Sequence, residues 1–155
     1  MNELVNYSSD AEIAHVAEKF ESCAFGSAEF THARHLTVLV WYLSHHSGKE
    51  ALDAMRTGLL RFSAHHDVPT LYHETITAFW VQVVDTFLRG HSQLTPLYTL
   101  ANEVVSTYGN KDFIFAYYSR DRLLSPEARA NWLEPDLRPL DVPSAVNRVQ
   151  STVDG

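Results

Sequence analysis

Two histidines stand three residues apart at the start of a long apolar stretch, in the segment 30–36 (FTHARHL). Residues three apart on a helix share a face, so His32 and His35 are expected to point the same way. They flank a stripe of leucines that should face the core, at positions 36, 39 and 43. Two inward imidazoles in such a place could transfer protons or bind a metal ion.

A second polar group begins another predicted helix, in the segment 72–77 (YHETIT). A helical wheel places His73 close to the apolar stripe that contains Ile76 and Trp80, so it should face inward. Glu74 lies near the opposite edge of the wheel. A helix N-terminus and burial both disfavour a protonated imidazole, whereas a nearby carboxylate such as Glu29 or Glu74 favours it.

These residues suggest three kinds of role. The candidate catalytic residues are His32, His35, His73 and Glu74. The candidate substrate-binding residues are Tyr72, Arg34 and Trp80. The candidate metal ligands are His32, His35 and His73, with Glu29 or Glu74 as a further ligand, and Zn²⁺ or Fe²⁺ would suit imidazole and carboxylate donors.

Two alternatives to a metal site stay open. The histidine pair lacks the glutamate of the metalloprotease helix motif, so the histidines could form a metal-free acid/base set. Each could also be a core histidine that simply bonds a backbone carbonyl.

The composition limits the kind of protein that carries this site. The chain has 155 residues, 45% of them hydrophobic, which suits one packed domain. A net charge of −7 disfavours nucleic acid and anionic membranes as partners. No apolar run approaches the roughly 20 residues that cross a bilayer. The first residues lack a secretory signal pattern, and Cys23 has no second cysteine to pair with, so a cytoplasmic location is predicted.

Apolar residues at three- and four-residue spacing predict helices at about 10–24, 31–46, 49–64, 72–88, 96–108, 111–124 and 126–133. The second is apolar almost all round, which indicates a central position. Gly58 lies on the apolar stripe of the third, where it costs about 1 kcal/mol against alanine, so a close helix contact is expected there. Prolines from residue 135 onward exclude regular helix.

We therefore predict a single all-α domain over residues 1–155, with a core at about 9–133 and an extended proline-rich tail at 134–155. Short connections favour a four-helix up-down-up-down core with two or three additional C-terminal helices. In that arrangement the second and fourth helices begin at the same end, which would bring His32, His35 and His73 together.

The leading hypothesis is a small helical enzyme that acts on a small polar metabolite, in specialised metabolism, through this histidine-rich site. The alternative is a non-catalytic ligand-binding protein or a partner subunit of a homo- or hetero-oligomer. In that case the aromatic segment 113–118 and the tail would form the contact surface.

Four segments also resemble a group of small bacterial helical proteins of uncharacterised function. They are FTHARHL at 30–36, YHETIT at 72–77, RLLSPEA at 122–128 and EPDL at 134–137. The resemblance covers about residues 28–140. It gives the two histidine segments additional weight and implies no particular reaction.

Overall fold

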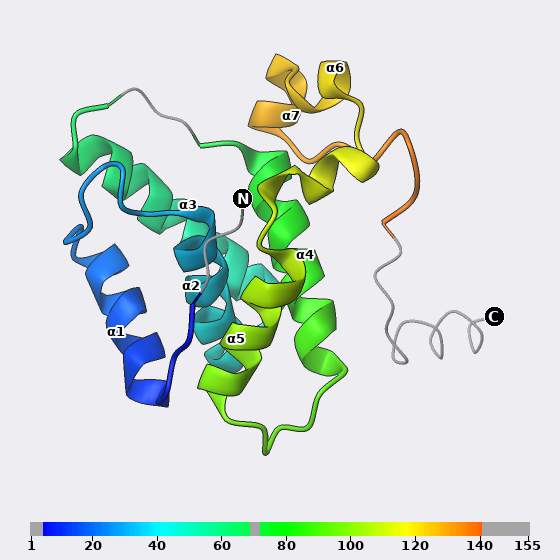
Figure 1. The fold of residues 1–155 in the computed structure, drawn as a ribbon. Coiled ribbons are helices and arrows are strands. Elements are labelled where there is room, and N and C mark those ends of the chain that lie inside the picture. Colours follow the sequence, from blue (N-terminus) through cyan, green and yellow to red (C-terminus); the bar gives the residue numbers. More distant parts are fainter. Residues whose placement is uncertain (1–4, 69–71, 141–155) are drawn as a thin grey trace.

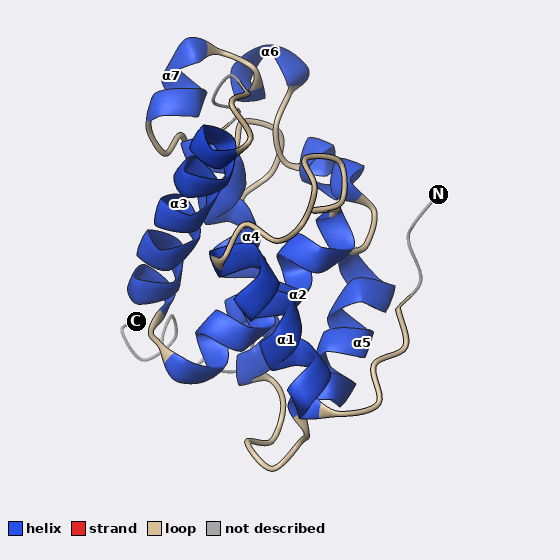
Figure 2. Ribbon diagram, turned by 90° about the vertical axis from the view of Figure 1, so that its left-hand side faces the viewer, coloured by secondary structure: helices blue, strands red, loops and turns tan. Residues whose placement is uncertain are grey.

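The computed structural model describes residues 5–68 and 72–140. These residues form helices, turns and loops without a strand, as the sequence predicts (Figure 2). The elements in chain order are α1 (Asp10–Glu21), α2 (His32–His45), α3 (Gly48–His65), α4 (Glu74–Arg89), α5 (Leu97–Tyr108), the 3₁₀ helix η1 (Lys111–Ala116), α6 (Arg120–Leu123) and α7 (Pro126–Ala130). Within the described ranges, every helix is too short or too polar to cross a membrane.

Helix α2 is the centre of the core, as its apolar sequence predicts. It packs against α1, α3, α4 and α5 (Figure 1). Its buried side chains point to several sides of the helix, because Leu36, Val38, Leu39 and Val40 are all fully buried. A helix that is apolar all round needs cover on every side.

Helix α5 provides part of that cover, so the described core contains five long helices rather than four. It contacts α1, α2 and α4. Its buried face consists of Leu100, Ala101, Val104 and Val105. The periodicity of this segment is correctly predicted, but its place in the core is not, because spacing along one helix does not reveal which helix it packs against.

Several local predictions agree with the structure. The second helix begins where the sequence predicts, and Thr31 caps it by accepting a hydrogen bond from the Arg34 amide. Ser47 caps α3 by accepting a hydrogen bond from the Glu50 amide, a role that was not predicted from the sequence. A methyl group on Gly58 would lie 2.4 Å from Cε2 of Phe20. The predicted close contact at Gly58 is therefore confirmed, between α3 and α1.

The C-terminal part differs from the prediction. The single helix expected at 111–124 is divided into η1 and α6, because Ser119 begins a new helix by accepting a hydrogen bond from the Arg122 amide. Helix α7 ends at Ala130, and residues 131–140 contain no helix. The predicted tail from residue 141 onward lies outside the described residues.

Candidate functional site

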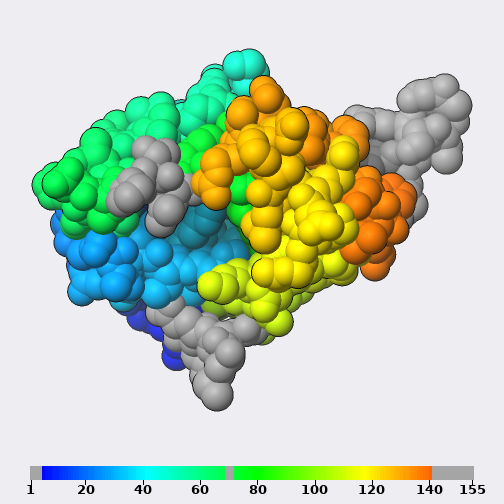
Figure 3. All heavy atoms as spheres, turned by 90° about the horizontal axis from the view of Figure 1, so that it is seen from above, coloured from blue at the N-terminus to red at the C-terminus, as the bar shows by residue number. Residues whose placement is uncertain are grey.

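Two adjoining cavities lie where α2 and α4 begin. Cavity A has a volume of about 390 Å³ and cavity B of about 350 Å³. They share four lining residues, Phe30, His35, Leu59 and Ile76. A view from this end shows the surface hollowed between the blue segment of α2, the green segment of α4 and the yellow segment of η1 and α6 (Figure 3). Both volumes lie in the range of small-molecule pockets.

His35 stands between the two cavities. Its Nε2 is buried and has no hydrogen-bond partner among the described residues. Burial, together with a smaller effect of the neighbouring His32, lowers the pKa of His35 to about 3. The imidazole is therefore neutral at physiological pH. A buried polar atom without a partner destabilises the fold by about 1–3 kcal/mol. A ligand that hydrogen-bonds this nitrogen would remove that cost.

His32 lines cavity A and has a defined tautomer. Its Nε2 lies 3.0 Å from the carbonyl oxygen of Tyr108. Because a carbonyl can only accept, the proton is on Nε2 and Nδ1 carries the lone pair. Burial lowers the pKa of His32, against the effect of the Tyr108 hydrogen bond. The ring packs edge-on against Trp80, with centroids 4.7 Å apart, which fixes its orientation.

His73 lines cavity B but both of its nitrogens are engaged. It is the N-cap of α4, not a residue of the first turn as predicted, and its Nδ1 accepts a hydrogen bond from the Ile76 amide at 3.1 Å. Its Nε2 donates to the carbonyl oxygen of Leu123 at 2.7 Å. Burial lowers the pKa of His73. In this structure the ring joins α4 to α6 and offers no free nitrogen to a substrate.

Glu74 is held in an ion pair outside both cavities. Its carboxylate accepts hydrogen bonds from Nε and Nη2 of Arg56 at 3.1 and 2.8 Å. The Tyr72 hydroxyl donates to the same carboxylate at 2.6 Å. The Arg56 guanidinium lowers the pKa of Glu74, and burial together with Glu74 raises the pKa of Tyr72 to about 12. Only Tyr72 reaches cavity B, so Glu74 can act on a ligand only by positioning Tyr72.

The other two predicted substrate-binding residues differ in outcome. Trp80 is 2% exposed and lines cavity A. Arg34 lines neither cavity. Its guanidinium lies 5.0 Å from the ring centroid of Phe25 and donates to the carbonyl oxygen of Glu29, so its prediction as a substrate-binding residue is not supported.

The predicted metal site does not assemble. Among residues 5–68 and 72–140, no three His, Cys, Asp or Glu side chains form a group that could hold a metal ion. The ring centroids of His32 and His35 are 6.4 Å apart, and His73 uses both nitrogens on backbone groups. Glu29, the other carboxylate predicted as a possible ligand, accepts a hydrogen bond from the Gly26 amide. The residues therefore do not fit Zn²⁺ or Fe²⁺, whose sites need three or four converging donors.

Part of the aromatic segment 113–118 belongs to the protein interior. Ile114, Tyr117 and Tyr118 are buried. The Tyr118 hydroxyl donates to the carbonyl oxygen of Leu133 at 2.6 Å, so this segment anchors the chain that follows α7.

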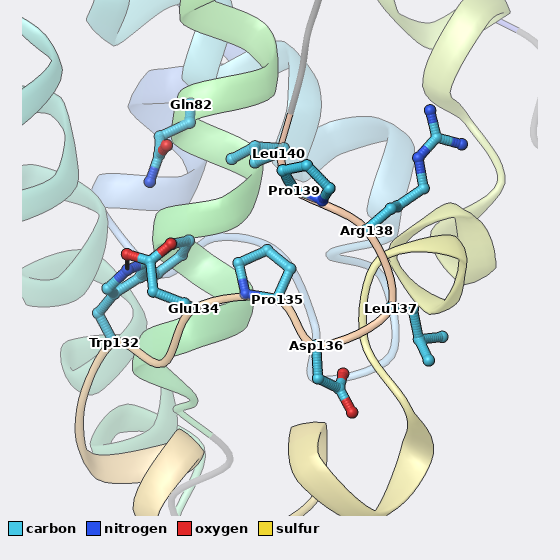
Figure 4. Close-up of a pocket in the computed structure, with 9 residues that line it drawn as sticks. All are labelled: Gln82, Trp132, Glu134, Pro135, Asp136, Leu137, Arg138, Pro139 and Leu140. Atoms are coloured by element: carbon cyan, nitrogen blue, oxygen red, sulfur yellow. Dashed lines mark hydrogen bonds between the residues drawn. The ribbon is translucent and has the colours of Figure 1, made fainter.

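A further cavity, of about 540 Å³, lies between Gln82 of α4 and residues 132–140 (Figure 4). The Trp132 indole donates to the Glu134 carboxylate at 2.9 Å. The side chains of Asp136 and Arg138 point away from one another and from the Trp132–Glu134 pair (Figure 4). This cavity contains none of the predicted site residues, and its polar groups do not converge.

The two charged residues of cavity A, Lys111 and Asp112 at the start of η1, were not among the predicted site residues. The turn-forming sequence GNKD at 109–112 indicates locally that one helix ends and another begins. Nothing local indicates that this turn lies against His32, which is about eighty residues earlier in the chain. Comparisons with protein-family models, with curated proteins and with solved structures found no match.

Proposed function

We propose that this protein binds a small, largely apolar molecule in cavities A and B and that His35 hydrogen-bonds the polar group of that molecule. The observation that carries this proposal is the buried Nε2 of His35, which has no partner among the described residues and belongs to a residue that lines both cavities. The lining is mainly aliphatic and aromatic, so the ligand is less polar than the sequence suggested.

We take helices α1–α4 to alternate in direction, as the sequence predicts, so that α2 and α4 begin at the same end of the bundle. A neutral imidazole presents one N–H donor and one acceptor nitrogen, so it can bind a hydroxyl, an amide or a carboxyl group. The resemblance of segments 30–36 and 72–77 to small bacterial proteins extends the proposal to that group.

A pair of bicyclic compounds tests the role of His35. We expect 2-naphthol to bind with a dissociation constant below ~1 mM, as a ligand of about ten heavy atoms can in an apolar pocket. His35→Leu is expected to weaken 2-naphthol about tenfold, the effect of one hydrogen bond in a dry site, and to leave naphthalene unchanged. Binding is measured by titration calorimetry, with ring ¹⁵N shifts of His35 as the site-specific signal.

His65→Leu is the matched control, because His65 is exposed and lines neither cavity. It should bind both compounds like the wild type. Equal affinity of His35→Leu and wild type for 2-naphthol, or an unchanged His35 signal on titration, would overturn the proposal.

An enzyme with His32 as general base is the second candidate. It is favoured by the hydrogen bond from His32 Nε2 to Tyr108, which keeps the proton on Nε2 and leaves Nδ1 able to accept one. His35 is a poorer base, because its pKa of about 3 is far below the working pH. His35 would then orient the substrate and His32 would take its proton.

The test is the consumption of small molecules from a metabolite extract, followed by mass spectrometry. If the second candidate is correct, His32→Gln slows the consumption of the substrate about 100-fold, a usual loss for a general base. It should bind 2-naphthol nearly as well as the wild type. His91→Gln is the control, since His91 follows the C-terminal end of α4. Equal consumption by the His32 variant and the wild type would contradict a catalytic role for His32.

A further inference from the structure

We infer, on the basis of the binding function proposed above, that the natural ligand is an apolar molecule with one carboxylate, held by the Lys111 ammonium at the mouth of cavity A. The apolar body then lies beside Trp80 and His35. Three observations carry this inference: the distribution of hydrogen-bond donors around cavity A, the position of Lys111 and the apolar character of the remaining lining.

Three side chains that line cavity A, those of Trp80, His35 and Lys111, have hydrogen-bond donors for a ligand. No hydrogen bond joins the Trp80 indole N–H to a described residue, although Trp80 lines the cavity. The His35 imidazole supplies one N–H, and the Lys111 ammonium supplies up to three. A carboxylate has only acceptor oxygens and can accept from all three donors, whereas an ammonium group can accept from none of them.

Lys111 is available for an ion pair with a ligand. It lies on the exposed rim of cavity A and forms no ion pair within the described parts of the chain. Its positive charge is close enough to His32 to contribute to the lowered pKa of that ring. A second cation lies near the same rim, because the Arg120 guanidinium is 4.8 Å from the centroid of Phe115, another lining residue.

Asp112 is the competing charge at this rim, since it also lines cavity A. Its carboxylate is not among the influences on the pKa of His32, whereas the Lys111 ammonium is. The Lys111 ammonium therefore acts on the His32 ring, and the Asp112 carboxylate opposes an anionic ligand at the rim. Deeper in the cavity the lining is apolar, which accommodates a hydrocarbon or aromatic body and no second charge.

Three compounds of the same shape and different charge test this inference: naphthalene-2-carboxylate, 2-naphthamide and 2-naphthylmethylamine. In low salt, the wild type is expected to bind the carboxylate about fivefold more tightly than the amide, as for one partly exposed ion pair. Lys111→Met should abolish this preference without changing the affinity for the amide. Lys111→Arg should restore it, and added salt should reduce it.

The control is Lys49→Met, since Lys49 is a surface lysine that pairs with Asp53 on α3. Asp112→Asn is expected to strengthen carboxylate binding by removing the like charge. Equal binding of the carboxylate and the amide, or tighter binding of the amine, would overturn the inference. If 2-naphthol still bound in that case, the proposed function would stand. Failure of 2-naphthol and of all three compounds would instead reject the proposed function, and the inference with it.

Discussion

Replacing His35 by leucine is expected to make the folded protein more stable while it weakens ligand binding. The wild-type ring keeps a buried Nε2 without a partner among the described residues, at a cost of about 1–3 kcal/mol. Leucine has a similar size and no polar atom, so the variant avoids that cost. A gain in stability that accompanies a loss of binding is typical of a residue kept for function rather than for folding.

The stabilisation by His35→Leu should grow as the pH falls. The pKa of His35 is about 3 in the folded state, below the value of about 6.5 for an unfolded histidine. The unfolded chain therefore binds a proton at pH values where the folded chain does not. The free energy of unfolding of the wild type is therefore unaffected by His35 protonation above about pH 6.5. As the pH falls toward 3, it decreases by about 1.4 kcal/mol for each pH unit because of this one group.

The range from pH 5 to pH 7 isolates the histidines, because carboxylates stay ionised there. His32 and His73 also have lowered pKa values and contribute with the same sign, so the wild type should lose more stability than one histidine explains. Urea unfolding at pH 7, 6 and 5 provides the measurement. A constant difference between His35→Leu and the wild type at these three pH values would show that folding does not lower the pKa of His35.

Replacing His73 by alanine is expected to have the opposite effect, a loss of about 2–4 kcal/mol. The variant loses the cap on the Ile76 amide, worth about 1 kcal/mol. It also leaves the carbonyl oxygen of Leu123 without its partner, at a cost of about 1–3 kcal/mol. For a chain of this length the melting temperature should fall by roughly 5–15 °C.

His73→Asn distinguishes the contributions of the two hydrogen bonds that the His73 ring makes. Asparagine is a good N-cap, so this variant should recover about 1 kcal/mol of the loss. It is too short to reach Leu123, so the rest of the loss should persist. His65→Ala is the exposed control and should change the stability by less than about 0.5 kcal/mol. If His73→Ala were as stable as that control, the assigned cap and the bond to Leu123 would both be wrong.

Together these variants distinguish a binding histidine from a structural one. The sequence places His32, His35 and His73 in one group of catalytic candidates. The structure divides them by the state of their nitrogens: His73 has none free, His32 has one free and His35 has no partner for its buried nitrogen. The same residue type therefore has three different chemical capacities around two adjoining cavities.

The helices could be predicted because their causes lie within a few residues. Hydrophobic spacing along 31–46 predicts α2 and its central position, and Thr31, a residue type that favours N-caps, caps this helix through its own side chain. The close approach at Gly58 could be predicted for the same reason, since glycine on an apolar stripe is costly unless another element lies against it.

The start of α4 shows the limit of such local reasoning. The usual N-caps are Ser, Thr, Asp and Asn, so the segment YHETIT gives no reason to expect an imidazole in that position. His73 takes it because its second nitrogen finds the carbonyl oxygen of Leu123, fifty residues further along the chain. The helix predicted from residue 72 therefore began two residues before the observed start of α4 at Glu74.

The site itself depends on distances along the chain that local patterns cannot span. The Tyr108 carbonyl fixes the tautomer of His32 across 76 residues. Lys111 reaches cavity A only because η1 folds back over the start of α2. His35 is neutral because it is buried and because the described residues of the other helices give its Nε2 no hydrogen bond and no carboxylate. Spacing in the sequence can place an imidazole on the inner face of a helix, but the partners of that imidazole come from the packing of the other helices around it.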